Sequence, residues 1–189
     1  MSYKIVTPMT LWQDYNPTKE PLEVVVTAVK NREKVISKEI EFTVETVSDG
    51  KIRAYATVVL QKSGKAPAFL FLPGAEAVIR RSKFYDIIVE NGFNFIVVDY
   101  AGKSPKKDNY TRYPESLSYC DYASNKDAVY KPVSADKSPW FTWMKVVRRA
   151  ITLAFDESNV DKDRFFLIGN AEGGQLAWKV AGIDGRVSA

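Results

Sequence analysis

The sequence predicts an α/β protein whose mostly parallel sheet carries an N-terminal antiparallel hairpin and helices on both faces. Three observations predict this class. Two short runs, 68–72 and 94–98, are apolar at every or nearly every position, which is typical of parallel strands buried on both sides. Amphipathic helical stretches alternate with the apolar runs further along the chain. Before them, residues 39–60 alternate polar and apolar side chains on either side of a turn, which indicates a hairpin with one buried face.

Composition limits the classes of function. The 189 residues are 46% hydrophobic, enough for one domain with a sizeable core, or one domain and an arm. The net charge of +4 comes from 27 basic and 23 acidic residues mixed along the chain, so we expect no nucleic-acid partner. No segment resembles a signal peptide or a membrane span, so we expect a cytoplasmic protein without a membrane partner. The lone cysteine, Cys120, is interpreted as structural, and we expect no metal site and no cofactor.

The N-terminal third is predicted to be an arm followed by a hairpin. Residues 1–36 form the arm, in which the β-branched run 22–29 is interpreted as a strand. The hairpin strands are 39–45 and 52–60, joined by a turn at Ser48-Asp49-Gly50.

The next elements alternate between strand and helix. The strand at 68–72 is followed by a helix over 77–91, in which apolar residues recur at helical spacing: Val78, Phe84, Ile87 and Ile88. The strand at 94–98 ends at Asp99. We interpret Asp99 as a structural residue that caps loop backbone, in preference to a catalytic acid.

Residues 37–189 are predicted to form the main domain, interrupted by one insertion. The insertion, 103–139, is rich in Lys, Asp, Ser, Tyr and Pro and has no sustained period, so it is predicted to be irregular. An amphipathic helix follows from Thr142 to Phe155. A strand at 164–168 and a helix at 172–181 complete the order.

The turn between the last strand and helix carries the most specific signal. It reads Gly169-Asn170-Ala171-Glu172-Gly173-Gly174, in the strand-turn-helix context of the G-x-S-x-G nucleophile elbow of serine hydrolases. The three glycines allow close approach of backbone at a sharp turn. Alanine stands at the serine position and has no atom that can attack a carbonyl. The chain also contains no histidine to serve as a general base.

A longer segment around this turn resembles a known family. Asp161 to Gln175 resembles the D-x-x-R-[IV]-x-[LV]-x-G-x-S-x-G-G segment of dienelactone-hydrolase-like and acetyl-xylan-esterase-like carboxylesterases, in the α/β-hydrolase superfamily. Val147-Arg148-Arg149-Ala150-Ile151 resembles the helix that precedes it. The resemblance covers residues 37–189 and implies the N-terminal half of such a hydrolase, truncated before the sixth strand, which begins at Arg186 to Ala189.

The resemblance also implies roles for individual residues. Ala171 takes the position of the nucleophile, and the oxyanion hole maps to the backbone N–H groups of Ala75 and Glu172. Gly169, Gly173 and Gly174 shape the elbow. Because backbone donors do not depend on the missing serine, an anion-seeking notch is expected at the start of helix 172–181. The implied ligand is a small ester, although this chain is expected to be inactive as an esterase.

Alternatives remain open. One is a pseudo-hydrolase that binds a ligand or partner; the other is a nucleotide-binding α/β domain, since Gly169-x-Ala171-x-x-Gly174 loosely matches G-x-G-x-x-G. The strand at 164–168 is apolar and has one edge without a predicted partner. We therefore expect a homo-oligomer or a complementary C-terminal chain at that edge.

Overall fold

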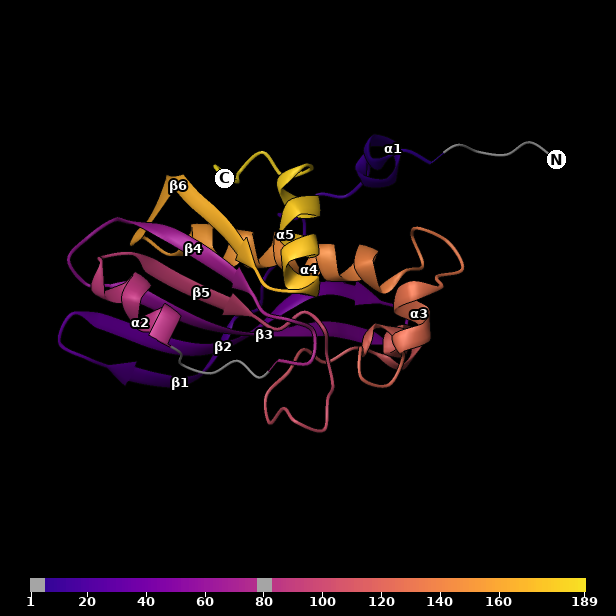
Figure 1. The fold of residues 1–189 in the computed structure, drawn as a ribbon, viewed down its shortest axis with the longest axis horizontal. Coiled ribbons are helices and arrows are strands. Elements are labelled where there is room, and N and C mark those ends of the chain that lie inside the picture. Colours follow the sequence, from indigo (N-terminus) through magenta and orange to yellow (C-terminus); the bar gives the residue numbers. More distant parts are fainter. Residues whose placement is uncertain (1–5, 78–82) are drawn as a thin grey trace.

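A computed structural model describes residues 6–77 and 83–189 of the chain (Figure 1). Its centre is a six-stranded mixed sheet with the strand order β1-β2-β3-β5-β4-β6. In chain order the strands are β1 (Val25–Asn31), β2 (Val35–Val47), β3 (Gly50–Gln61), β4 (Ala66–Leu72), β5 (Asn94–Val98) and β6 (Val160–Gly169). β4 is parallel to both β5 and β6, whereas the first three strands pair in antiparallel fashion. The predicted α/β class with an N-terminal hairpin is confirmed.

Helices lie on both faces of the sheet. They are α1 (Pro8–Trp12), α2 (Lys83–Glu90), the 3-10 helix η1 (Glu115–Cys120), α3 (Lys126–Tyr130), α4 (Pro139–Asp156) and α5 (Glu172–Ala181). α5 has the predicted bounds. α4 begins earlier than predicted because Ser138 caps it, accepting a hydrogen bond from the Phe141 N–H, and Pro139 suits the first helical position. The predicted start of α2, including Val78, lies outside the described residues.

The N-terminal residues contribute to the same sheet. β1 pairs with β2, in a register that joins Val25 to Glu41 and Asn31 to Ile36. The segment before β1 is held by the buried guanidinium of Arg149, which donates hydrogen bonds to the carbonyl oxygens of Pro17 and Pro21. The residues predicted to form an arm therefore add an edge strand to the main sheet.

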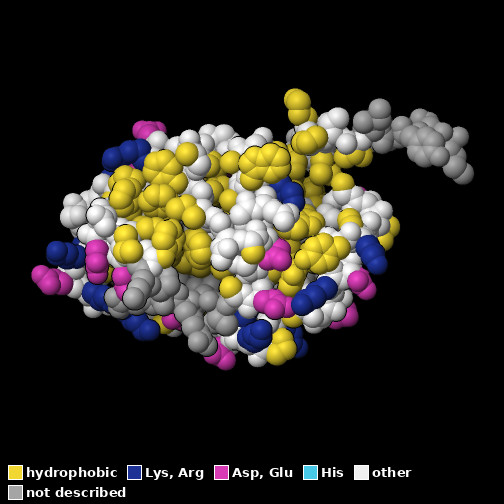
Figure 2. Space-filling model, in the orientation of Figure 1, with side chains coloured by type: hydrophobic (Ala, Val, Ile, Leu, Met, Phe, Trp, Pro, Cys, Tyr) yellow, Lys and Arg dark blue, Asp and Glu magenta, His cyan; other side chains and the backbone are white. Residues whose placement is uncertain are grey.

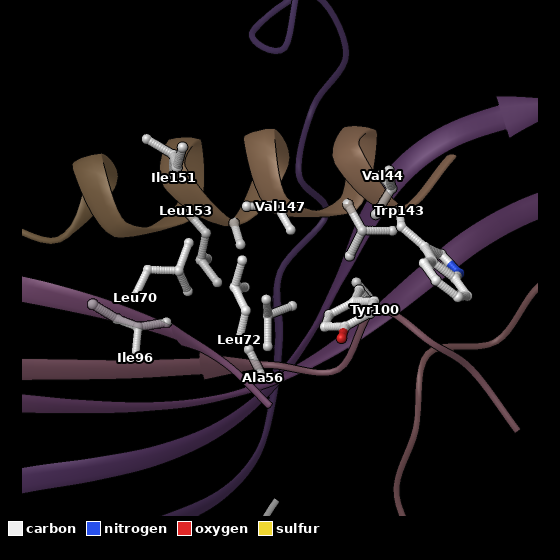
Figure 3. Close-up of a cluster of buried hydrophobic side chains, with 14 of the residues drawn as sticks. Val44, Ala56, Leu70, Leu72, Ile96, Tyr100, Trp143, Val147, Ile151 and Leu153 are labelled. Atoms are coloured by element: carbon white, nitrogen blue, oxygen red, sulfur yellow. The ribbon is translucent and has the colours of Figure 1, made fainter. Parts of the chain in front are cut away.

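The larger core lies between the sheet and helices α4 and α5. Alternate side chains of β4 and β5, among them Leu70, Leu72 and Ile96, are fully buried against the apolar stripe of α4 (Figure 3). Val147 and Ile151 of that stripe are also fully buried. This packing holds α4 against the two interior strands β4 and β5.

The opposite face of the sheet is covered less completely. α2 covers Phe95 and Val97 of β5, but Phe69 and Phe71 of β4 are only half-buried. Phe166 of β6 lies beside Phe69, with 5.2 Å between the ring centroids. Figure 2 shows hydrophobic side chains gathered on the surface over β4 and β6.

The outer edge of β6 is partly paired by the end of the chain. The Ser188 N–H donates to the Phe165 carbonyl, and the Leu167 N–H donates to the Ala189 carbonyl. Pairing advances in the same direction along both segments, as the beginning of a parallel strand would. In the described part of the chain, no helix combines the length and apolar character needed to cross a bilayer.

Candidate functional site

The candidate site lies where β6 turns into α5. Ala171 stands at this junction with φ 51° and ψ −123°, and its side chain is exposed. A positive φ costs an alanine roughly 1–2 kcal/mol relative to ordinary backbone, so the surrounding structure must hold it. The turn raises residue 171 above the C-terminal end of the sheet, the edge where α/β proteins bind ligands.

Two glycines make this turn sterically feasible. A Cβ atom added to Gly169 would lie 2.1 Å from the carbonyl oxygen of Gly173. A Cβ atom added to Gly173 would lie 2.0 Å from the carbonyl oxygen of Leu72, at the end of β4. Gly174 is less constrained, since its added Cβ would come within 3.3 Å of Gly169 oxygen. The helix therefore starts in direct backbone contact with two strand ends.

The loop after β4 lies against the same turn. A Cβ atom added to Gly74 would lie 3.6 Å from the Ala171 Cβ, and the Ala75 N–H donates to the Glu172 carboxylate at 3.4 Å. The structure thus brings together Ala75, Ala171 and Glu172, the residues that the resemblance assigned to one site.

The carboxylate of Glu172 has a second partner from the insertion. The Tyr122 hydroxyl donates to Glu172 Oε1 at 3.1 Å and lies 3.2 Å from the Tyr130 hydroxyl. The hydrogen bond with Tyr130, burial and the Glu172 carboxylate all raise the pKa of Tyr122, so its phenol keeps its proton. Sequence reasoning had assigned Glu172 only a backbone role. No local signal identified its side-chain partners, because Tyr122 is distant in sequence and lies in a segment without periodicity.

The loop after β4 is fixed by buried polar groups. The Lys107 ammonium, from the insertion, donates to the Ala75 carbonyl at 2.9 Å and to Asp99 Oδ1 at 2.5 Å. Asp99 also accepts the N–H groups of Gly102 and Thr111. Asp99 thus caps loop backbone, as the sequence indicated, and the ion pair is almost fully buried.

Other features around the site are structural. Glu76 pairs with Lys126 of α3 at 2.7 Å, which joins the loop after β4 to the insertion.

Cys120 is fully buried, and burial raises the pKa of its thiol to about 12, so it is a weak nucleophile. Across residues 6–77 and 83–189, no three histidine, cysteine, aspartate or glutamate side chains are grouped to hold a metal ion.

An apolar groove lies away from this site. It has a volume of about 590 Å³ and runs between α1 and the C-terminal end of α5, with Trp12, Met144 and Trp178 among its lining residues. None of the candidate site residues lines it.

Comparison with known proteins identifies the fold. No protein-family model matches the chain, and no curated protein sequence matches it significantly. The solved structure of acetyl xylan esterase 1 from Thermoanaerobacterium sp. is similar, with a TM-score of 0.69 and 17% identity over 95% of this chain and 55% of that chain. A glucuronoyl esterase from Solibacter usitatus has a TM-score of 0.60, with 17% identity over the same shares of the two chains. A dienelactone-hydrolase-like promiscuous phosphotriesterase from metagenomic libraries has a TM-score of 0.56, with 19% identity over 82% of this chain and 57% of that chain.

These identities are low, so the likeness concerns the fold. The chain spans about half the length of the solved structures that it matches. Beyond its edge strand β1, the sheet has the order β2-β3-β5-β4-β6, with helices on both faces. Along the chain, a hairpin, two buried strands and the strand before α5 follow one another in the order that the resemblance implied. The chain has the α/β-hydrolase fold, in the form found in acetyl xylan esterases, glucuronoyl esterases and dienelactone-hydrolase-like proteins.

Proposed function

We propose that this chain is an ester-hydrolase scaffold of the carboxylesterase or deacetylase type that binds the carbonyl group of a small ester without cleaving it. The backbone of Ala171 is the observation that carries the proposal. Its positive φ, its exposure and its place between β6 and α5 are the features of a nucleophile elbow, in which the strained turn presents the attacking side chain.

The chemistry at residue 171 argues against cleavage. A nucleophilic mechanism needs a side-chain oxygen, sulfur or nitrogen atom that forms the covalent intermediate, and alanine carries only a methyl group. Serine alone would not supply the missing function, because its hydroxyl must lose a proton to a base and the 189 residues contain no histidine.

Binding does not require the serine. Ala75 carries an N–H in the loop after β4, and Glu172 carries the first N–H of α5. The next two N–H groups of the helix, those of Gly173 and Gly174, already donate to the carbonyl oxygens of Asn170 and Ala171. Two such donors that converge on one oxygen are the physical basis of carbonyl recognition in acyl-transfer sites. The loop that carries Ala75 is held by Lys107 and by the Tyr100 hydroxyl, which donates to the Pro73 carbonyl at 2.6 Å.

Hydrolysis of p-nitrophenyl acetate tests the proposal. We expect wild type and Ala171→Ser to release p-nitrophenol at the rate of buffer alone. Turnover well above buffer that is lost on Gly74→Val would contradict the proposal, because Gly74 lies beside Ala171 and a bulky side chain there would obstruct the site.

The nucleotide-binding alternative needs a separate test. A thermal-shift series with ATP and NAD should leave the melting temperature unchanged. A saturable rise with NAD would instead favour a dinucleotide site at the glycine-rich turn.

A further inference from the structure

The carboxylate of Glu172 accepts a hydrogen bond from the Ala75 N–H, the donor that the proposed function assigns to a ligand oxygen. Its Oε2 lies 3.4 Å from the Ala75 nitrogen, and the same oxygen would lie 3.7 Å from a Cβ added to Gly74. The Ala75 nitrogen carries one hydrogen, so it cannot serve Glu172 and an external oxygen equally well.

An acidic residue in the first turn of a helix is common, because it interacts favourably with the helix dipole. That general effect requires no partner outside the helix. Glu172, however, contacts two other segments, through the Ala75 N–H and through the Tyr122 hydroxyl at 3.1 Å. Tyr122 is itself buried and lies against Trp143, with 6.1 Å between the ring centroids. The Glu172 carboxylate is therefore held by hydrogen bonds from two segments, the loop after β4 and the insertion.

We propose that Glu172 is a specificity-determining residue: its carboxylate is an internal ligand of the notch and excludes external carboxylates from the Ala75 N–H. This inference rests on the proposed function, because it assumes that the notch binds oxygen ligands. An incoming carboxylate must displace Glu172 from both Ala75 and Tyr122. It also approaches a like charge. A neutral ester carbonyl must also displace Glu172, but it is not repelled by the negative charge. Glu172 therefore favours neutral ligands over carboxylates.

The test is an NMR titration of the full chain with sodium acetate, followed at the Ala75 amide. Three variants are compared with wild type: Glu172→Ala, Tyr122→Phe and the control Asp127→Asn, which alters an exposed carboxylate of the same insertion. Without acetate, Glu172→Ala should shift the Ala75 resonance and speed its hydrogen exchange, whereas Asp127→Asn should leave both unchanged. Tyr122→Phe, which keeps the ring and removes the hydroxyl, should change them in the same direction and by less.

With acetate, the Ala75 resonance should move saturably in Glu172→Ala, with an affinity ~10-fold or more above that of wild type, as expected from the loss of one charge-assisted hydrogen bond. Equal affinities in wild type and Glu172→Ala would overturn the inference and leave the proposed function standing. An Ala75 resonance that responds to Glu172→Ala but to acetate in neither protein would overturn both. If the Ala75 resonance does not respond to Glu172→Ala at all, the hydrogen bond between the Ala75 N–H and the Glu172 carboxylate is absent in solution, and the inference fails.

Discussion

Gly173 of α5 and Leu72 of β4 touch through their backbones: a Cβ atom on Gly173 would lie 2.0 Å from the Leu72 carbonyl oxygen. The Leu72 carbonyl cannot move away easily, because it belongs to β4, an interior strand of the sheet, and the Leu72 side chain is fully buried. This approach brings the start of α5, and with it Ala171 and Glu172, against the loop after β4.

The contact predicts that Gly173→Ala destabilises the protein. The added methyl forces the strand and helix apart, and overpacking of this kind costs about 1–3 kcal/mol or more. Urea unfolding measures the change. Gly185→Ala is the matched control, because nothing lies within 4 Å of its added Cβ. Equal stabilities of the two variants would contradict the close approach.

A second prediction concerns the buried pair of Lys107 and Asp99. Lys107→Met leaves the Asp99 carboxylate buried without its cation, and breaking a buried pair on one side costs about 3–5 kcal/mol. Adding Asp99→Asn removes the uncompensated charge, so the double variant should be more stable than Lys107→Met alone. A double-mutant cycle of unfolding free energies checks this. Additive effects would show that the two groups do not interact.

Acid stability provides a third prediction, centred on Asp184. Burial acts to raise the pKa of this carboxyl, but hydrogen bonds and charge from Arg186 and Arg148 leave the pKa below its ordinary value. A carboxyl whose pKa is lowered in the folded state contributes stability above its unfolded pKa of ~3.9, and this is lost as the pH falls through the folded pKa.

Asp184→Asn should therefore reduce the unfolding free energy by about 3 kcal/mol at pH 7, and by clearly less below pH 3. Unfolding curves at several pH values measure the difference in unfolding free energy, here called the gap, between wild type and Asp184→Asn. Asp127→Asn, at an exposed position, should show little difference from wild type at any pH. A gap for Asp184→Asn that is constant from pH 7 to pH 2 would contradict the assignment.

The fourth prediction concerns the partly covered face and edge beside β6. Parallel strands are normally buried on both sides, yet Phe69 and Phe166 are only half-buried and residues 188 and 189 pair with just part of the β6 edge. We propose that a second copy or a complementary C-terminal segment covers this region. For the chain alone, light scattering should show association that Phe166→Lys weakens. Val133→Lys, at an exposed residue elsewhere, should not alter it.

A strictly monomeric protein would count against this proposal. Slow hydrogen exchange at the amides of Phe165 to Ile168 in that monomer would show that the edge is already protected from within the chain.

Local patterns predicted much of the fold. The helix at Glu172–Ala181 and the strand at Asn94–Val98 have the predicted bounds, because an apolar run between polar turn residues leaves few alternatives. Hydrophobic alternation also predicted the hairpin of β2 and β3. Pairing of β1 with β2 was not predicted, since an exposed edge strand carries little pattern that specifies its neighbour.

The arrangement of the candidate site was predictable only in those parts that depend on backbone geometry. The glycines at 169 and 173 are required by steric contact, so their spacing was informative. The side-chain contacts of Glu172 with Tyr122 and of Lys107 with Ala75 were not predictable. Both depend on how an insertion without sustained period folds over the end of the sheet, and a single sequence carries no local signal for such long-range pairs.

The central claim is that Ala171 stands at the nucleophile position of the elbow but cannot form a covalent bond. The most direct test is incubation with a serine-directed phosphonate, followed by peptide mass spectrometry. A phosphonate labels a hydrolase by forming a bond to the activated nucleophile of its elbow. We predict that the peptide containing Asn170 to Gln175 remains unmodified in wild type. Covalent phosphonate on that peptide, or on any residue that contacts it, together with turnover of p-nitrophenyl acetate above buffer, would contradict the account.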